Sequence, residues 1–445
     1  MLLKNATLIT AGKVGEGSVL IEGERISDVW WADSEDYTFK VEIFSKKHPE
    51  IEIKALTGKH IIAGGIDAHV HFREPGLTHK ADMETESKAA VAGGVTTVFD
   101  MPNTKPATTG AAELADKIRL AKGRTLANIG FHIGATNENA AEIARLVKEG
   151  DTEAGLCATD IAGIKVFMGS STGNMLVDEQ QTLAELFSIS EKPILVHCED
   201  EQTIKDNLEK AKAKYGDEIP FEEHENIRSR YACIKSSIKA LELAIKYNTR
   251  LTLCHISTKE EIEMVRAAKI SNPSITAETS CNYLWFNNKD YSRMGSRLKC
   301  NPAVKTDADR EALRNALRDG LIDTIGSDHA PHLLSEKDAP YTSAPSGLPS
   351  IQQTLPVLIT VAEQEEIPLE RIASVFSEKA SEIYGLERGK LAKGYFADLV
   401  IFDKDKEFEV LAEDQYSKCG WSPYEGETLK GFIEEIIING KQINL

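Results

Sequence analysis

Eight short apolar runs rich in β-branched residues recur between residues 61 and 327, and stretches with helical periodicity separate them. This repeat predicts parallel strands covered by helices, because parallel neighbours need a long crossover connection. The expected strands are 61–71, 95–101, 128–135, 163–168, 193–198, 250–256, 274–280 and 322–327. The clearest helical stretches are 108–122, 229–247, 259–269 and 308–319. Eight such units favour an α/β fold, a (β/α)8 TIM-like barrel, with an open doubly wound sheet as the alternative.

Both ends of the chain have the alternating pattern of β-strands, unlike the middle. The expected end strands are 2–9, 18–30, 397–402, 433–438 and 441–445. Glu22-Gly23-Glu24 suits a hairpin turn, and Asn439-Gly440 is typical of a type I′ turn. We therefore predict a small composite β-sandwich domain from residues 1–60 plus 386–445, beside a barrel domain of residues 61–385.

The overall charge and the cysteine usage exclude several classes of protein. The net charge of −18 argues against nucleic acid or an anionic membrane as the main partner. Seven scattered cysteines without a C-x-x-C pair disfavour a disulfide scaffold and favour a reducing cytoplasm. No apolar run reaches the length of a membrane span, and the first residues are too polar for a signal peptide. We expect a cytoplasmic protein that acts on a small molecule, and a homo-oligomer is left open.

Chemically active side chains gather at the expected strand ends, which is where barrel enzymes place their active sites. His69 and His71 alternate on the first strand and therefore share a face. Such a pair alone is as readily structural as metal-binding. Further candidates lie in or after four other strands, namely Lys165, His197, His255 and Asp328. Each alone has a simple structural explanation, such as packing or helix capping. Packing alone would not place four histidines at equivalent strand ends, so we predict a metal centre.

The residue types suggest how two metal ions would be shared. His69, His71 and Asp328 suit one divalent ion, and His197 and His255 suit a second. Imidazole and carboxylate ligands fit zinc, with manganese or cobalt as alternatives. Two ions about 3.5–4 Å apart need an anionic bridge. A lysine ammonium would repel them, whereas an N6-carboxylated Lys165 could bridge them.

These six residues resemble the metal-binding set of the amidohydrolase superfamily, and within it the cyclic amidohydrolases: dihydroorotases, hydantoinases and allantoinases. The resemblance covers nearly the whole chain and implies a barrel with a β-sandwich built from both ends. Three motifs look most like dihydroorotases, namely His71-Phe72-Arg73-Glu74-Pro75-Gly76, Met101-Pro102-Asn103-Thr104 and Ser327-Asp328-His329-Ala330-Pro331-His332. Hydantoinases and allantoinases generally lack the arginine at position 73 and the histidine at position 332.

The substrate gives a physical reason for these positions. Dihydroorotate carries a carboxylate beside its ring, which Arg73 can bind bidentately with help from Asn103 and His332. The resemblance also assigns substrate contacts to Asn301, Ser346 and Gly347. The chain departs from the family at three places. The family's Asn-Pro-Pro-Leu-Arg appears as residues 301–305, Asn-Pro-Ala-Val-Lys, Ser346 replaces a usual phenylalanine, and the lysine bridge is more typical of hydantoinases than of long bacterial dihydroorotases.

The resemblance implies reversible hydrolysis of the cyclic amide of (S)-dihydroorotate to N-carbamoyl-L-aspartate, a step of de novo pyrimidine (UMP) biosynthesis. A hydroxide that bridges the metals would attack the ring carbonyl, with Asp328 as the proton shuttle. The alternatives are a hydantoinase or allantoinase and, remotely, a non-catalytic scaffold.

We expect loop 169–175 or loop 335–347 to close over the substrate. Strand alternation predicts that Cys198 and Cys254 point away from the metals.

Overall fold

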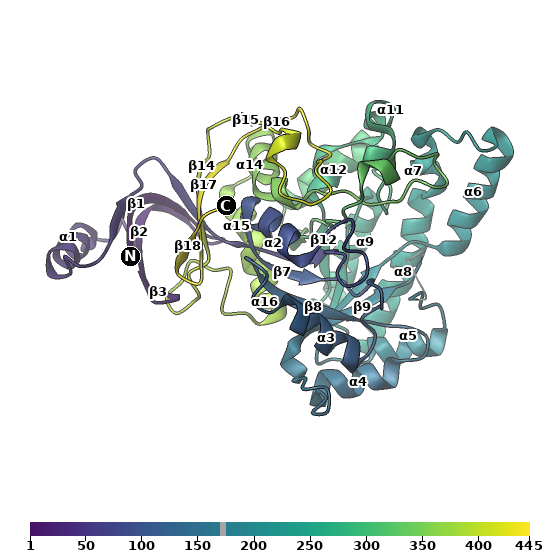
Figure 1. The fold of residues 1–445 in the computed structure, drawn as a ribbon, viewed down its shortest axis with the longest axis horizontal. Helices are drawn as coiled ribbons and strands as arrows, with labels where there is room; N and C mark the ends of the chain where they lie inside the picture. Colours follow the sequence, from purple (N-terminus) through teal and green to yellow (C-terminus); the bar gives the residue numbers. More distant parts are fainter. Residues whose placement is uncertain (170–174) are drawn as a thin grey trace.

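The computed structural model describes residues 1–169 and 175–445, and its centre is a barrel of eight parallel strands (Figure 1). In neighbour order the strands are β6 (Gly65–Val70), β7 (Val95–Asp100), β8 (Asn128–Gly134), β9 (Ile161–Phe167), β10 (Ile194–His197), β11 (Leu251–Leu253), β12 (Thr276–Thr279) and β13 (Thr324–Ile325). The barrel nearly closes where the His71 amide donates to the His329 carbonyl at 2.8 Å. The predicted (β/α)8 barrel is confirmed.

Helices surround the barrel, as Figure 1 shows. The main ones are α2 (Met83–Ala92), α3 (Ala111–Ala121), α4 (Ala140–Glu149), α5 (Gln180–Phe187), α6 (Glu201–Tyr215), α8 (Arg230–Tyr247), α9 (Lys259–Ser271), α12 (Asp307–Arg318) and α14 (Thr354–Gln364). Their apolar faces follow helical spacing: Ile143, Leu146 and Val147 of α4 are all buried. A capping box between Thr258 and Glu261 starts α9. All four predicted helical stretches match helices of the structure.

The two chain ends together form a second sheet, which lies beside the barrel in Figure 1. Its order is β18 (Lys441–Ile443), β17 (Phe432–Ile438), β14 (Leu399–Asp403), β5 (His60–Ala63), β1 (Leu2–Ile9), β2 (Val14–Glu22) and β3 (Arg25–Trp31), with β4 (Ile53–Ala55) also beside β1. Asn439 and Gly440 both have positive φ, as a type I′ turn requires. The composite β-domain of both chain ends is confirmed, whereas its boundaries at residues 60 and 386 stay predictions.

One predicted strand proves to be two. Residues 61–71 were expected to form a single barrel strand, but β5 belongs to the end sheet and β6 to the barrel. The chain changes sheet at Gly64, where an added Cβ would lie 2.2 Å from Thr96 Oγ1. Both strands are apolar, so periodicity alone could not separate them. This junction fixes the start of the strand that carries the first two histidines.

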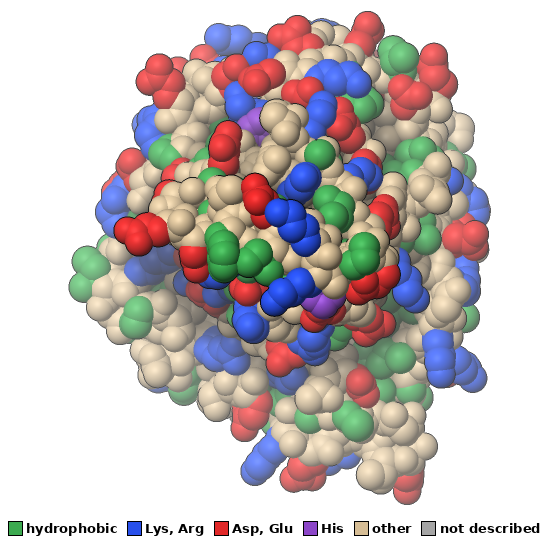
Figure 2. All heavy atoms as spheres, turned by 90° about the vertical axis from the view of Figure 1, so that its left-hand side faces the viewer, with side chains coloured by type: hydrophobic (Ala, Val, Ile, Leu, Met, Phe, Trp, Pro, Cys, Tyr) green, Lys and Arg blue, Asp and Glu red, His purple; other side chains and the backbone are tan. Residues whose placement is uncertain are grey.

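The exterior carries charges of both signs. On the face in Figure 2, where the end sheet and helix α1 (Tyr37–Lys47) face the viewer, basic and acidic side chains are interspersed. In the part of the chain that the structure describes, no helix is both long and apolar enough to cross a membrane.

Candidate metal centre

The barrel strands end at a pocket of about 310 Å3. All the residues predicted for the site line it, namely His69, His71, Arg73, Asn103, Lys165, His197, His255, Asn301, Asp328, His332, Ser346 and Gly347. Phe167, Ala330 and Pro345 complete the wall and were not predicted. The predicted residues come from widely separated parts of the chain, and the barrel brings them together. Their individual roles stay predictions.

His69, His71 and Asp328 form the first candidate ligand group. Asp328 Oδ1 lies 3.4 Å from His69 Nε2 and 3.0 Å from His71 Nε2, and one ligand atom from each residue lies within 4.8 Å of the others. Burial alone would raise the pKa of the Asp328 carboxyl, but the two imidazoles lower it well below its ordinary value. Asp328 has φ +49°, a strained conformation of the kind that concentrates at functional sites. The carboxylate is therefore held ionised among the histidines.

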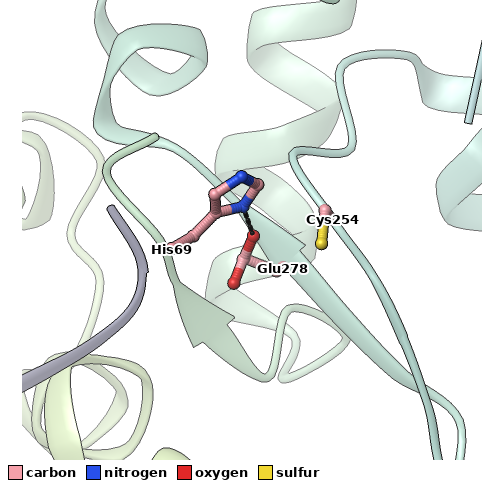
Figure 3. A group of neighbouring side chains, drawn as sticks. All are labelled: His69, Cys254 and Glu278. Atoms are coloured by element: carbon pink, nitrogen blue, oxygen red, sulfur yellow. Dashed lines mark hydrogen bonds and ion pairs between the residues drawn. The ribbon is translucent and has the colours of Figure 1, made fainter. Parts of the chain in front are cut away.

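Both of these histidines are anchored through their other nitrogen. His69 Nδ1 contacts Glu278 Oε1, the contact drawn as a dashed line in Figure 3, at 2.7 Å. His71 Nδ1 lies 2.7 Å from Asn103 Oδ1. An acceptor on one imidazole nitrogen fixes the proton there and leaves the other lone pair for a metal. The structure therefore presents Nε2 of both rings to the first candidate site. Asn103, predicted only as a substrate contact, also orients His71.

His197 and His255 form the second group. His197 Nδ1 lies 2.9 Å from His255 Nε2, while His197 Nε2 contacts Glu199 Oε2 at 3.1 Å. Glu199 is fully buried and also pairs with Arg228. Burial lowers the pKa of both imidazoles, so the rings are neutral and able to ligate. His255 has φ +38°. The pair suits a second divalent ion.

Lys165 lies fully buried in the wall of the pocket that both groups of histidines line. Its ammonium donates to Cys254 Sγ at 3.5 Å and lies 5.1 Å from the centre of the Phe167 ring. Within residues 1–169 and 175–445 no carboxylate forms an ion pair with it. A buried ammonium without a paired carboxylate is costly. Conversion to an anionic carbamate in the presence of cations would remove that cost.

The expectation for Cys254 is wrong. Its sulfur lies 3.5 Å from Lys165 Nζ, and the three residues drawn in Figure 3, Cys254, Glu278 and His69, each place a ligand atom within 4.8 Å of the others. Strand β11 ends at Leu253, so the alternation used for the prediction does not continue to residue 254. Cys198 packs in the apolar core as expected. Because the short His69–Glu278 hydrogen bond occupies His69 Nδ1, we assign Glu278 to orienting His69.

One wall of the pocket is cationic. Arg73 is buried, donates from Nε to the Pro331 carbonyl at 3.1 Å, and places Nη2 3.0 Å from His332 Nε2. Lys80 Nζ lies 3.0 Å from Nδ1 of the same imidazole. Burial, together with the charges of Arg73 and Lys80, lowers the pKa of His332 far below its ordinary value. This wall is suited to an anionic group, and the sequence did not indicate the part played by Lys80.

Loop 335–347, one of the two expected lids, is tied down by buried lysines. Lys337 Nζ donates to the carbonyls of Lys299, Pro345 and Gly347, and Lys299 Nζ donates to those of Tyr341 and Ala344. These contacts favour a fixed wall that carries Ser346 and Gly347. In the other candidate lid, 169–175, residues 170–174 lie outside the described residues.

A TIM-like barrel with four histidines, a lysine and an aspartate at its strand ends is the architecture of barrel hydrolases that use divalent metals. Comparison with known proteins narrows this class. The model of the amidohydrolase family matches residues 60–443, and the chain belongs to this family.

Individual relatives agree with this assignment. The chain is 35% identical to a dihydroorotase of Methanosarcina acetivorans, over 83% of this chain and 78% of that protein. It is 32% identical to a dihydroorotase of Staphylococcus epidermidis, over 99% of this chain and 98% of that protein. Among solved structures, L-hydantoinase (dihydropyrimidinase) from Arthrobacter aurescens has a TM-score of 0.88 at 25% identity, covering 99% of this chain and 95% of that one. The protein is a hydrolase that acts on cyclic amides.

Glu278 is predicted to set the metal affinity through His69. Replacing Glu278 by glutamine is expected to weaken zinc binding about 10- to 100-fold, because a neutral amide raises the basicity of the His69 ring less than a carboxylate does and can also turn its NH2 group toward Nδ1. Competition with a chelating dye measures the affinity. Glu261→Gln is the matched control, since Glu261 is equally buried but caps α9, and it should lower only the melting temperature. Unchanged zinc affinity in E278Q would show that Glu278 does not orient the ligand.

Proposed function

We propose that the protein is a dihydroorotase, which reversibly hydrolyses the cyclic amide of (S)-dihydroorotate to N-carbamoyl-L-aspartate in pyrimidine biosynthesis. The observation that carries this proposal is the buried Arg73, which shares one pocket of about 310 Å3 with the candidate metal ligands and lies against His332. A guanidinium so placed recognises a planar carboxylate. Dihydroorotate has such a group on its ring, and the named relatives above support the choice.

We propose that His69, His71 and Asp328 hold one divalent ion, that His197 and His255 hold a second, and that N6-carboxylated Lys165 bridges them. Two features support this donor set. One ring nitrogen each of His69, His71 and His197 is anchored, and Lys165 is buried without an ion-paired carboxylate among the described residues. Bound there, two zinc ions would supply the Lewis acidity that polarises a ring carbonyl and acidifies water.

The protein side chains then transfer the proton and bind the substrate. Asp328 Oδ1, central among the histidines, takes the proton of the attacking water and gives it to the departing ring nitrogen. Arg73 and His332 hold the carboxylate, and Asn103 assists through its Nδ2. Asn301 Oδ1 is buried in the described structure without a hydrogen-bond partner, so it can accept a hydrogen bond from a ring N–H. These contacts, with Ser346 and Gly347, orient the ring for attack.

A hydantoinase or allantoinase is the second candidate, and the likeness to L-hydantoinase favours it. Hydantoin and allantoin have no ring carboxylate, however, and would leave the buried Arg73 charge without a counter-ion. A non-catalytic scaffold is disfavoured because all six candidate ligands line the pocket. Freshly purified protein without metal would support the scaffold.

An assay of ring opening decides between these functions. Purified protein, supplied with zinc and bicarbonate, is expected to open dihydroorotate and to close N-carbamoylaspartate, with little action on hydantoin or allantoin. The same sample should contain two metal ions per chain and, when the bicarbonate is 13C-labelled, the carbon resonance of a lysine carbamate that a Lys165→Ala variant lacks. Opening of hydantoin or allantoin but not of dihydroorotate would overturn the proposal.

The cellular setting is also proposed. Seven free thiols are consistent with a reducing cytoplasm, and the acidic net charge disfavours a nucleic-acid partner. Fractionation of cells tests the location, and light scattering of the purified protein tests for a homo-oligomer.

A further inference from the structure

The imidazole of His332 lies between two cations that can only donate hydrogen bonds. Lys80 Nζ is 3.0 Å from Nδ1, and Arg73 Nη2 is 3.0 Å from Nε2. Neither an ammonium nor a guanidinium can accept a hydrogen bond, and a neutral imidazole accepts at one nitrogen only. The ring can therefore satisfy one of the two cations but not both.

The remaining contacts decide which cation is satisfied. The Ser346 carbonyl lies 3.1 Å from His332 Nε2 and can only accept, so it requires a proton on Nε2. On the other side, the nearest carboxylate oxygen to Nδ1, Glu336 Oε2, is 3.7 Å away, beyond hydrogen-bond range. A proton on Nε2 thus satisfies both Lys80 and Ser346, whereas a proton on Nδ1 satisfies Arg73 alone. Glu336 instead holds Lys80 in place at 2.9 Å.

With the proton on Nε2, two N–H donors face each other inside the pocket, one from Arg73 and one from His332. Two donors 3.0 Å apart lack a shared acceptor, and an anionic oxygen within reach of both would accept from Arg73 and share the Nε2–H of His332 with the Ser346 carbonyl. We propose that Lys80 is a positioning residue that fixes His332 as an Nε2–H donor and thereby completes, with Arg73, a two-donor clamp for the substrate carboxylate. This inference rests on the proposed function, since it describes how the carboxylate of the same substrate is bound.

The first test reads the tautomer of His332 directly and needs no substrate. In protein labelled with 15N-histidine, the nitrogen resonances of His332, assigned with His332→Asn, are expected to show the proton on Nε2. In Lys80→Leu, which keeps an apolar chain but removes the ammonium, the resonances should shift toward the Nδ1–H tautomer. A wild-type ring protonated on Nδ1, or a tautomer unchanged in K80L, would overturn the proposal.

The second test uses kinetics. K80L is expected to raise KM for dihydroorotate about tenfold with kcat changed less than about threefold, and Lys80→Arg should restore KM. In an H332N background K80L should raise KM no further, because Lys80 acts through that ring. Equal effects of K80L in both backgrounds would overturn the proposal.

Lys418→Leu is the matched control. Lys418 binds the same segment, at the Thr78 carbonyl and Asp82, without touching His332, so K418L should leave KM unchanged. If K418L raised KM as K80L does, the effect would belong to the segment and not to the imidazole, and the proposal would fail. Absence of dihydroorotate turnover by the wild-type protein would instead refute the proposed function, while the resonances of His332 would still report on Lys80.

Discussion

Replacing Asp328 by asparagine is expected to lower kcat for dihydroorotate by at least about 10³-fold, because the amide keeps the shape of the side chain but cannot take a proton. The carboxylate lies 3.0 Å from His71 Nε2 and 3.4 Å from His69 Nε2, so its loss also removes the negative charge from the first ligand group. Steady-state assays in both directions measure the effect, and metal analysis of the same sample separates lost proton transfer from lost metal.

A control variant at the other end of the same strand distinguishes chemistry from stability. Asp323 lies just before β13, pairs with Lys269 and accepts from the Ala277 amide. Residues at the amino-terminal face of a barrel contribute to stability and not to catalysis. Asp323→Asn should therefore lower the melting temperature and leave kcat within about threefold. A D328N variant that retained more than a tenth of kcat would remove Asp328 from the proposed proton path.

The candidate site could be predicted because barrel topology converts position in the sequence into position in space. Once eight strands are recognised, the residue at the end of each one must face the same opening. His197, His255 and Asp328 were found by this rule alone, and all three line the pocket. The rule depends only on the strand ends, so errors of several residues in the helices or loops did not affect it.

The residues that orient the ligands could not be found in the same way. Glu278 lies 209 residues from His69 in sequence, and Lys80 lies 252 residues from His332. Their roles depend on which side chains the closed barrel brings into contact, and no local pattern encodes that. Cys254 shows the related limit, because alternation holds only while the strand continues, and β11 ends one residue earlier.

Replacing Arg73 by alanine is expected to lower kcat/KM for dihydroorotate by about 10²- to 10³-fold, equivalent to about 3–4 kcal/mol, the usual cost of truncating one partner of a buried charge pair. The side chain is buried beside His332 and points its guanidinium into the pocket that also holds the candidate ligands. Its contribution is to binding and orientation, so metal content should stay at the wild-type value.

The decisive comparison for Arg73 uses 5,6-dihydrouracil, the same ring without the carboxylate. Wild-type protein is expected to open it slowly, and R73A should open it at the same rate, because the missing guanidinium has no group to bind. Arg73→Lys keeps the charge but loses the planar fork, so its kcat/KM for dihydroorotate should fall between the wild-type and R73A values. If R73A lowered turnover of both rings equally, Arg73 would serve to shape the pocket. The case for a carboxylated substrate, which depends on this residue more than on any metal ligand, would then lose its physical basis.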